Sequence, residues 1–137
     1  MTESTSSSLA AAACRTGIRP AQRIWLQDHG TPFFGVGIRE LLVRVQETGS
    51  LRQAASEMGL AYSKAWRIVR RAEEHLGFTL LKRRAGGVNG GGSAPSDEAL
   101  RLVSSFGALL EEAEAALDEL YARHFSDWPG GSGNGRG

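Results

Sequence analysis

Two short amphipathic segments joined by a single glycine are the feature that most limits how this chain can fold. The first segment, 51–58, follows Ser50, whose hydroxyl can cap a helix by accepting a backbone N–H. Gly59 ends this segment, and a second one runs from about 61 to 76. The first carries the small pair Ala54-Ala55, which allows a neighbouring helix to approach closely. We therefore predict two helices that cross over a tight turn, as in a helix-turn-helix.

The second predicted helix separates into two faces when its residues are placed about 100° apart. The face expected to meet the core contains Tyr62, Ala65, Val69, Ala72 and Leu76. The opposite face is exposed and basic, and its first turns carry three candidates for contact with DNA base edges: Ser63, Lys64 and Arg67. An arginine there can bridge O6 and N7 of guanine in the major groove. Trp66 falls on a flank, where packing is the expected role.

Charge is segregated along the chain although the formal net charge is only +1. Residues 61–84 hold seven basic and two acidic residues, a local balance of +5. Residues 97–121 hold seven acidic residues and one basic residue, a local balance of −6. A basic middle predicts a surface that meets phosphates, and such contacts set affinity rather than sequence preference. The candidates for phosphate contact are Ser50, Arg70, Arg71, Arg83, Arg84, Gly86, Gly87 and Asn89.

Small β elements are expected on both sides of the helices. Apolar runs at 23–27 and 33–34, separated by turn residues, predict a hairpin, and 36–47 has the apolar spacing of a helix that ends at Gly49. Residues 78–84 predict a strand, followed by a glycine-rich stretch at 85–93. That stretch is interpreted as a wing hairpin or a partly disordered loop. The predicted fold class is mainly α with small β, a winged helix-turn-helix.

A long last helix is predicted from Asp97 onward. Its apolar residues recur at alternating spacings of 4 and 3, which is the a/d pattern of a coiled coil. The seam residues expected to join two chains are Val103, Phe106, Leu110, Leu117 and Leu120. The favoured partner is the same helix in a second chain, which makes this a C-terminal dimerisation helix. The alternative is that the seam packs back on its own domain.

These patterns predict four regions along the chain. An N-terminal tail, 1–20, is expected to be disordered, and a winged helix-turn-helix DNA-binding domain follows at 21–96. The dimerisation helix occupies 97–125, and a Gly-rich flexible tail occupies 126–137.

Several function classes are disfavoured by what the sequence contains. The one cysteine fits a reducing cytoplasm, and no apolar run approaches the roughly 18 residues of a membrane span. The three histidines are scattered, so neither a metal nor another cofactor is expected. No set of residues suggests nucleophilic or acid–base catalysis. We therefore expect a cytoplasmic protein that is not an enzyme and has no contact with membranes.

The residues of the helix-turn-helix also carry a family resemblance. Thr48-Gly49-Ser50-Leu51, then Ala54-Ala55, Met58-Gly59-Leu60 and Glu73-Glu74-His75-Leu76-Gly77 resemble the N-terminal DNA-binding domain of LysR-type regulators. The stretch Ala61-Tyr62-Ser63-Lys64-Ala65-Trp66, together with the glycines between 86 and 92, is closer to molybdate-responsive regulators of the ModE type. The resemblance implies DNA binding and, by association, a link to molybdenum metabolism.

The chain departs from the ModE-type pattern in three ways. Ala61 stands where the family has a serine, which removes a helix cap worth about 1 kcal/mol. Val88 replaces a wing lysine. The chain is also expected to stand alone, without the molybdate-binding domains of the family, so any effector is unknown.

Two hypotheses of different class follow. The first is a homodimeric, sequence-specific transcriptional regulator that binds double-stranded DNA. The alternative is a protein-interaction module that uses the winged-helix scaffold without reading DNA. Salt-sensitive binding to a duplex distinguishes them, because a surface that neutralises phosphates must lose affinity steeply as salt rises.

Overall fold

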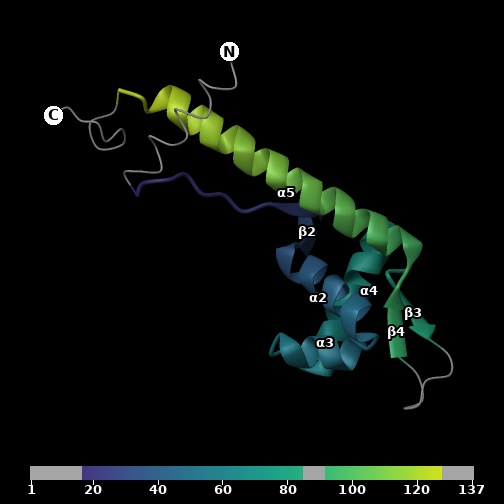
Figure 1. Cartoon of the computed structure of the whole chain (residues 1–137). Helices are drawn as coiled ribbons and strands as arrows, with labels where there is room; N and C mark the ends of the chain where they lie inside the picture. Colours follow the sequence, from purple (N-terminus) through teal and green to yellow (C-terminus); the bar gives the residue numbers. More distant parts are fainter. Residues whose placement is uncertain (1–16, 85–91, 128–137) are drawn as a thin grey trace. The chain divides into compact units, whose positions relative to one another are not determined.

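The computed structural model describes residues 17–84 and 92–127, and it contains short helices packed together beside small antiparallel strand pairs (Figure 1). The order of elements is β1 (Trp25–Asp28), β2 (Thr31–Gly35), α2 (Val36–Thr48), α3 (Leu51–Glu57), α4 (Tyr62–Leu76), β3 (Leu81–Arg84), β4 (Gly92–Pro95) and α5 (Asp97–His124). The predicted fold class is confirmed, with α3 and α4 as the helix-turn-helix. One compact unit spans Ile24–Gly107, and a second combines residues 1–23 with 108–137.

The hairpin predicted ahead of the first helix is formed by β1 and β2. Its turn consists of His29 and Gly30, whose φ angles of 51° and 85° are both left-handed. Two such residues between Asp28 and Thr31, which pair across the strands, match the turn that suits the right-handed twist of a hairpin. The local sequence therefore determines this element.

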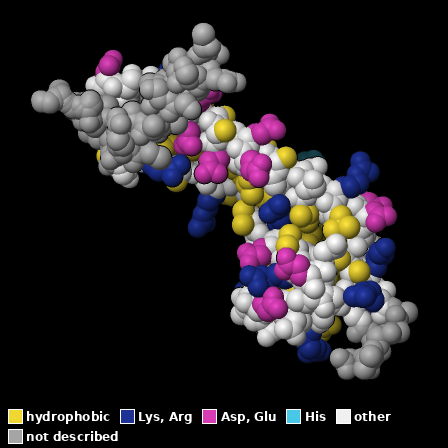
Figure 2. All heavy atoms as spheres, in the orientation of Figure 1, with side chains coloured by type: hydrophobic (Ala, Val, Ile, Leu, Met, Phe, Trp, Pro, Cys, Tyr) yellow, Lys and Arg dark blue, Asp and Glu magenta, His cyan; other side chains and the backbone are white. Residues whose placement is uncertain are grey.

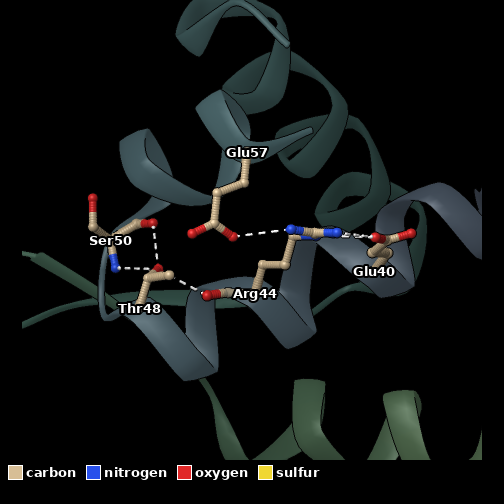
Figure 3. A network of polar contacts seen from close by, with 5 residues as sticks. All are labelled: Glu40, Arg44, Thr48, Ser50 and Glu57. Atoms are coloured by element: carbon tan, nitrogen blue, oxygen red, sulfur yellow. Dashed lines mark hydrogen bonds and ion pairs between the residues drawn. The ribbon is translucent and has the colours of Figure 1, made fainter. Parts of the chain in front are cut away.

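The turn from α2 into α3 is held by short-range hydrogen bonds (Figure 3). Gly49 adopts φ 77°, which ends α2, and the Ser50 hydroxyl accepts the N–H of Gln53 at 3.0 Å. The predicted cap at Ser50 is thus confirmed. Thr48 donates its hydroxyl to the carbonyl of Arg44 at 2.8 Å and accepts the N–H of Ser50 at 3.2 Å. These bonds fix the direction in which α3 leaves the turn.

Arg44 ties α2 to α3 through two carboxylates (Figure 3). Its Nη2 lies 2.6 Å from Glu40 Oε2, one turn earlier on α2, and its Nη1 lies 3.0 Å from Glu57 Oε1 on α3. The hydrogen bond to Glu40, and then that to Glu57, raises the pKa of Arg44 above its usual value. Arg44 is therefore a structural cation whose charge is neutralised within the fold.

The core of the unit Ile24–Gly107 is shared by all its helices. The most buried residues include Leu41, Leu42, Val45, Leu51, Ala54, Ala55, Ala65, Val69, Ala72 and Leu80. The small alanines predicted to let α3 and α4 approach are therefore at the helix contact. Tyr62 was predicted to join this core and does not, because it lies at the start of α4 beside Arg52 and stays 37% exposed. The absence of a side-chain cap at Ala61 is confirmed.

β3 and β4 pair antiparallel, with Leu81 opposite Pro95 and Arg84 opposite Gly92. We call these two strands the wing. The sequence predicted a strand at 78–84 and interpreted the glycine-rich stretch at 85–93 as a wing hairpin or a partly disordered loop. The described residues of that stretch, Gly92 and Ser93, lie in β4. β4 has a further backbone contact, since Ser93 donates its N–H to the carbonyl of Gly49 at 2.9 Å. The wing is thereby attached to the turn between α2 and α3.

The entry into α5 is also fixed by side chains. The hydroxyl of Ser96, which is buried, donates to the carbonyl of Thr79 at 2.6 Å and accepts the N–H of Ala99 at 3.0 Å. The Glu73 carboxylate accepts the N–H of Leu80 at 2.8 Å. These bonds connect the end of α4 to the wing and to α5.

The predicted seam on α5 has two different environments. Ala99 and Phe106 are buried in the unit Ile24–Gly107, and the ring of Phe106 meets that of Phe34 edge-on at 5.2 Å. The prediction that Phe106 joins two chains is therefore corrected: it packs within its own chain, because β2 already covers it. Val103 is half-buried, and its carbonyl accepts the Nε–H of Arg39 at 2.9 Å.

The second unit contains the later turns of α5. Arg19 lies 3.7 Å from Asp118, and the rings of Tyr121 and Phe125 stack at 4.8 Å. In this unit Leu110 and Leu117 are half-buried, whereas Leu109 and Leu120 are exposed by 44% and 41%. Most of the predicted tails, at 1–16 and 128–137, lie outside the described residues.

Candidate nucleic-acid interface

The face of α4 opposite the core is exposed and basic, as predicted. Ser63, Lys64 and Arg67 are all exposed in its first turns, and Arg70 and Arg71 follow on the same helix. Figure 2 shows Lys and Arg side chains at several points on the surface of the unit that carries α2, α3 and α4, and acidic side chains along α5. The three candidates for base contact are thus free to meet a ligand from solvent.

A pocket opens beside this face, between the start of α3, one side of α4, and the wing. It has a volume of about 580 Å³. Four cations contribute to its wall: Arg52, Arg70, Lys82 and Arg83. We call it the basic pocket. Tyr62 and Trp66 also line it, and no acidic residue is among the described residues that do.

Two of these cations lie against aromatic rings. The guanidinium carbon of Arg52 is 4.1 Å from the centre of the Tyr62 ring, and that of Arg70 is 5.1 Å from the centre of the Trp66 ring. Both distances are within the range of cation–π attraction, which at exposed sites is worth about 0.5–1 kcal/mol. The rings are themselves linked, because the Trp66 indole N–H donates to the Tyr62 hydroxyl at 2.8 Å. An Arg52–Tyr62–Trp66–Arg70 chain therefore connects α3 to α4.

The cations of the basic pocket differ from Arg44 in their electrostatics. Within the part of the chain that the structure describes, none of the four forms an ion pair with a carboxylate. Arg44, by contrast, has two acidic partners. Four unneutralised cations around one pocket create a positive potential that attracts an anionic ligand.

Only some of the residues predicted to contact phosphates lie together in the structure. Ser50, Arg70 and Arg83 line the basic pocket, and the Ser50 hydroxyl accepts its capping bond there without using its own O–H donor. Arg71 is exposed on α4, outside the pocket lining. The Arg84 guanidinium lies against Gly49, where any side chain at that glycine would meet it. Gly86, Gly87 and Asn89 lie outside the described residues.

Two pocket cations were missed by the sequence reasoning. Lys82 was counted in the basic segment but given no role, and Arg52 was treated only as part of the first helix of the pair. A signal for Arg52 was present: a cation in the first turn of a helix is disfavoured by the helix dipole. Its place at the second position of α3 therefore indicates a partner outside that helix.

The far end of α4 is anchored to the β1–β2 hairpin. Asp28 Oδ2 lies 3.0 Å from His75 Nδ1, and Asp28 Oδ1 lies 2.8 Å from His29 Nδ1. The contact with His75, and then that with His29, lowers the pKa of Asp28. The Phe33 ring stacks on His75 with centroids 5.2 Å apart. These contacts hold the last turn of α4 while its first turns remain exposed.

Comparison with known proteins finds a family match for most of the region that contains this site. Residues 39–90 match the family described as bacterial regulatory helix-turn-helix protein, lysR family. The chain is similar to the molybdenum transport protein ModE of Azotobacter vinelandii, with 35% identity over 96 residues. It is similar to the transcriptional regulator ModE of Haemophilus influenzae, with 36% identity over 80 residues. It also matches the HTH-type transcriptional regulator CrgA of Neisseria meningitidis, with 33% identity over 84 residues.

These similarities cover much of this chain but little of the relatives. The three alignments include 70%, 58% and 61% of the chain, and 35%, 31% and 26% of the respective relatives. The chain thus spans about a third of the length of the ModE relatives it matches. Among the helices of the described residues, none is both long and apolar enough to cross a membrane.

Proposed function

We propose that this protein is a sequence-specific transcriptional regulator that reads duplex DNA with α4, because residues 39–90 match the lysR-type regulatory helix-turn-helix family and the chain is similar to ModE regulators. The observation that carries the proposal is the exposed basic face of α4 beside a pocket of unneutralised cations. In a helix-turn-helix, the second helix enters the major groove and its N-terminal residues meet the bases. We therefore assign base contact to Ser63, Lys64 and Arg67.

The remaining candidates are proposed to bind phosphates. Arg70, Arg71, Arg83 and Arg84 carry charges that position the protein on the duplex without reading sequence. Ser50 contributes the O–H of its hydroxyl, because the oxygen only accepts in the capping bond and the backbone N–H is already bonded to Thr48. Gly86, Gly87 and Asn89 remain proposed on the sequence alone. The same proposal includes no catalytic activity and places the protein in the cytoplasm, where bacterial DNA lies.

The similarity to ModE supports one further element of the proposal. Two of the relatives are named for molybdenum transport and for transcriptional regulation. We include control of molybdenum-related genes in the proposed function. Since the alignments cover about a third of those relatives, they carry no inference about an effector.

A homodimer completes the proposal. Leu110, Leu117 and Leu120 share one side of α5 at the spacing of a coiled-coil seam, and none is fully buried by its own chain. Val103, in the unit Ile24–Gly107, belongs to the same predicted seam and is half-buried. Two copies joined here would present two α4 helices to half-sites about one helical turn of DNA apart.

Arg67→Ala tests base reading. Duplexes would first be selected from a random pool, and binding of the variant to a selected and a scrambled duplex would then be measured by mobility shift. We expect Arg67→Ala to weaken binding to the selected duplex by about 1–3 kcal/mol and to change binding to the scrambled one little. Arg84→Ala is the control, and should weaken both duplexes alike.

Two results would contradict the proposal. An equal loss on both duplexes for Arg67→Ala would remove Arg67 from base reading. The absence of any duplex binding by the wild-type protein at low salt would reject DNA binding, and would favour a protein-interaction module built on the same scaffold.

A further inference from the structure

We infer that the basic pocket binds the phosphodiester backbone of one DNA strand, with Arg52 and Lys82 as contacts and Tyr62 and Trp66 as positioning residues. This inference rests on the proposed DNA binding and names the part of the DNA that the pocket takes. None of these four residues belongs to the set already assigned to DNA contact.

The location of the pocket selects the backbone rather than the bases. Its wall comes from α4 and the start of α3, which supplies Arg52, and from Lys82, Arg83 and Ser93 of the wing. When α4 lies in a major groove, the strand that borders the groove must pass the side of the helix. The opening of about 580 Å³ between α4 and the wing is the place for it.

The chemistry of the pocket matches the same ligand. Its four cations have no acidic partner among the described residues, whereas the nearby Arg44 has two. Duplex DNA carries one negative charge per phosphate, so a backbone segment neutralises such a cluster. Four cations that line one pocket without an acidic residue repel one another, and an anionic ligand relieves this repulsion.

The surroundings of the two arginines leave their charge available to phosphate oxygens. The guanidinium carbon of Arg52 lies over the Tyr62 ring, 4.1 Å from its centre. An aromatic ring attracts the cation without neutralising its charge, so the five N–H donors of this arginine have no carboxylate partner among the described residues. The guanidinium carbon of Arg70 lies over the Trp66 ring, 5.1 Å from its centre.

The aromatic pair fixes these two arginines relative to each other. Trp66 follows Tyr62 by one helical turn of α4, and its indole N–H donates to the tyrosine hydroxyl. Arg52 comes from α3 and Arg70 from α4, so the linked rings hold together two cations from different helices. Tyr62 and Trp66 thus act on DNA binding through Arg52 and Arg70.

The salt dependence of binding tests the contacts. The affinity of the full chain for a duplex would be measured between about 50 and 200 mM salt, where each lost phosphate contact lowers the slope of log K against log salt by about 0.9. We expect this reduction for Arg52→Ala and for Lys82→Ala. The matched control is Arg101→Ala, which removes one exposed positive charge on α5, outside the pocket lining, and should leave the slope unchanged.

A double-mutant cycle tests positioning. If Tyr62 acts through Arg52, Tyr62→Ala should lower the slope as much as Arg52→Ala does, and the double variant should lower it no further. Tyr62→Phe loses the bond from Trp66 but keeps the ring over which Arg52 lies, so it should lower the slope less than Tyr62→Ala does. An equal loss in these two variants would overturn the role of the ring. Circular dichroism of each variant reports whether the fold is kept.

The outcomes separate this inference from the proposed function. If the wild-type chain binds duplexes with a steep salt dependence but Arg52→Ala and Lys82→Ala behave like Arg101→Ala, the pocket does not hold the backbone. Additive losses from Arg52→Ala and Tyr62→Ala would overturn the positioning role of Tyr62. If the wild-type chain binds no duplex at any salt concentration, the proposed function itself fails.

Discussion

At the scale of single residues, Arg44 and Arg52 differ in what surrounds their positive charge. This difference distinguishes an arginine that stabilises the fold from one proposed to bind DNA. Arg44 has Glu40 and Glu57 within hydrogen-bonding distance, so its charge is used to join α2 to α3. Arg52 has the face of Tyr62 and no carboxylate among its described neighbours. A cation held in place but left unneutralised is available to an anion, and this is the physical basis of the proposed phosphate contacts.

Asp28 gives a prediction for pH dependence. Its pKa is lowered below the usual value of 3.8, first by His75 and then by His29. A lowered pKa in the folded state means that the charged carboxylate stabilises the fold above the unfolded value, and that this contribution disappears as the pH falls through the folded value. The affected range therefore lies below about pH 4.

Asp28→Asn should remove this dependence. Urea unfolding at a series of pH values should show the wild-type free energy of unfolding falling more steeply below pH 4 than that of the variant. Glu74→Gln is the matched control, because it removes one exposed carboxylate from the same unit and should keep the wild-type profile. Parallel profiles for wild type and Asp28→Asn would show that ionisation of Asp28 beside His75 and His29 does not stabilise the fold.

At the scale of elements, the wing is held by a close approach of two glycines. Gly92 begins β4, and a β-carbon built on it would collide with the carbonyl oxygen of Gly49. That carbonyl also accepts the N–H of Ser93 at 2.9 Å. Since the colliding atom belongs to the backbone of a tight turn, it cannot move aside as a flexible side chain would.

Gly92→Ala should therefore detach the wing from the turn between α2 and α3. We expect the free energy of unfolding to fall by about 1–3 kcal/mol, through the lost hydrogen bond and the shifted strand. Gly37→Ala is the matched control: no atom lies within 4 Å of a β-carbon there, and alanine in a helix should raise stability by about 0.5–1 kcal/mol. Chemical denaturation measures both, and equal stability of the two variants would contradict the proposed close contact.

The elements also show why one part of α5 differs from the rest. Its heptad-like spacing is continuous from Ala99 to Leu120, but the spacing does not say what covers each turn. Phe34 of β2 already covers Phe106, so the early part of the seam belongs to the helix-turn-helix unit. The later leucines are only partly covered, and they are the ones proposed to meet a second chain.

At the scale of the whole molecule, Leu117→Glu tests the dimer. A charge placed in an apolar contact between two helices must be desolvated, so the variant should sediment with the mass of a monomer while the wild type sediments as a dimer. Ala115→Glu is the matched control, since Ala115 is exposed and lies on the opposite side of α5, and it should leave the mass unchanged. An unchanged mass for Leu117→Glu would remove Leu117 from the dimer contact and favour packing within the chain.

The local signals of this sequence determined most of the elements. Apolar periodicity, the Ser50 cap and the positive-φ glycines depend on neighbouring residues only, and they correctly indicated α2, α3, α4 and the exposed basic face of α4. The same signals were enough to predict the winged helix-turn-helix, because its pattern of small residues and glycines lies within one continuous stretch. The roles of Ser63, Lys64 and Arg67 in reading bases remain predictions.

Some side chains lie at the boundary between the buried and the exposed face of a helix, and only the tertiary structure shows which residues they contact. Tyr62 lies at such a boundary, and Arg52 from another helix, rather than the core, became its neighbour. The ring of Phe106 packs against that of Phe34, 72 positions earlier in the chain, and Gly92 lies against the carbonyl of Gly49. A helical period states which residues share a side, whereas the packing of distant segments determines what that side meets. For the same reason, the helix-turn-helix was evident from the sequence and the basic pocket beside it was not.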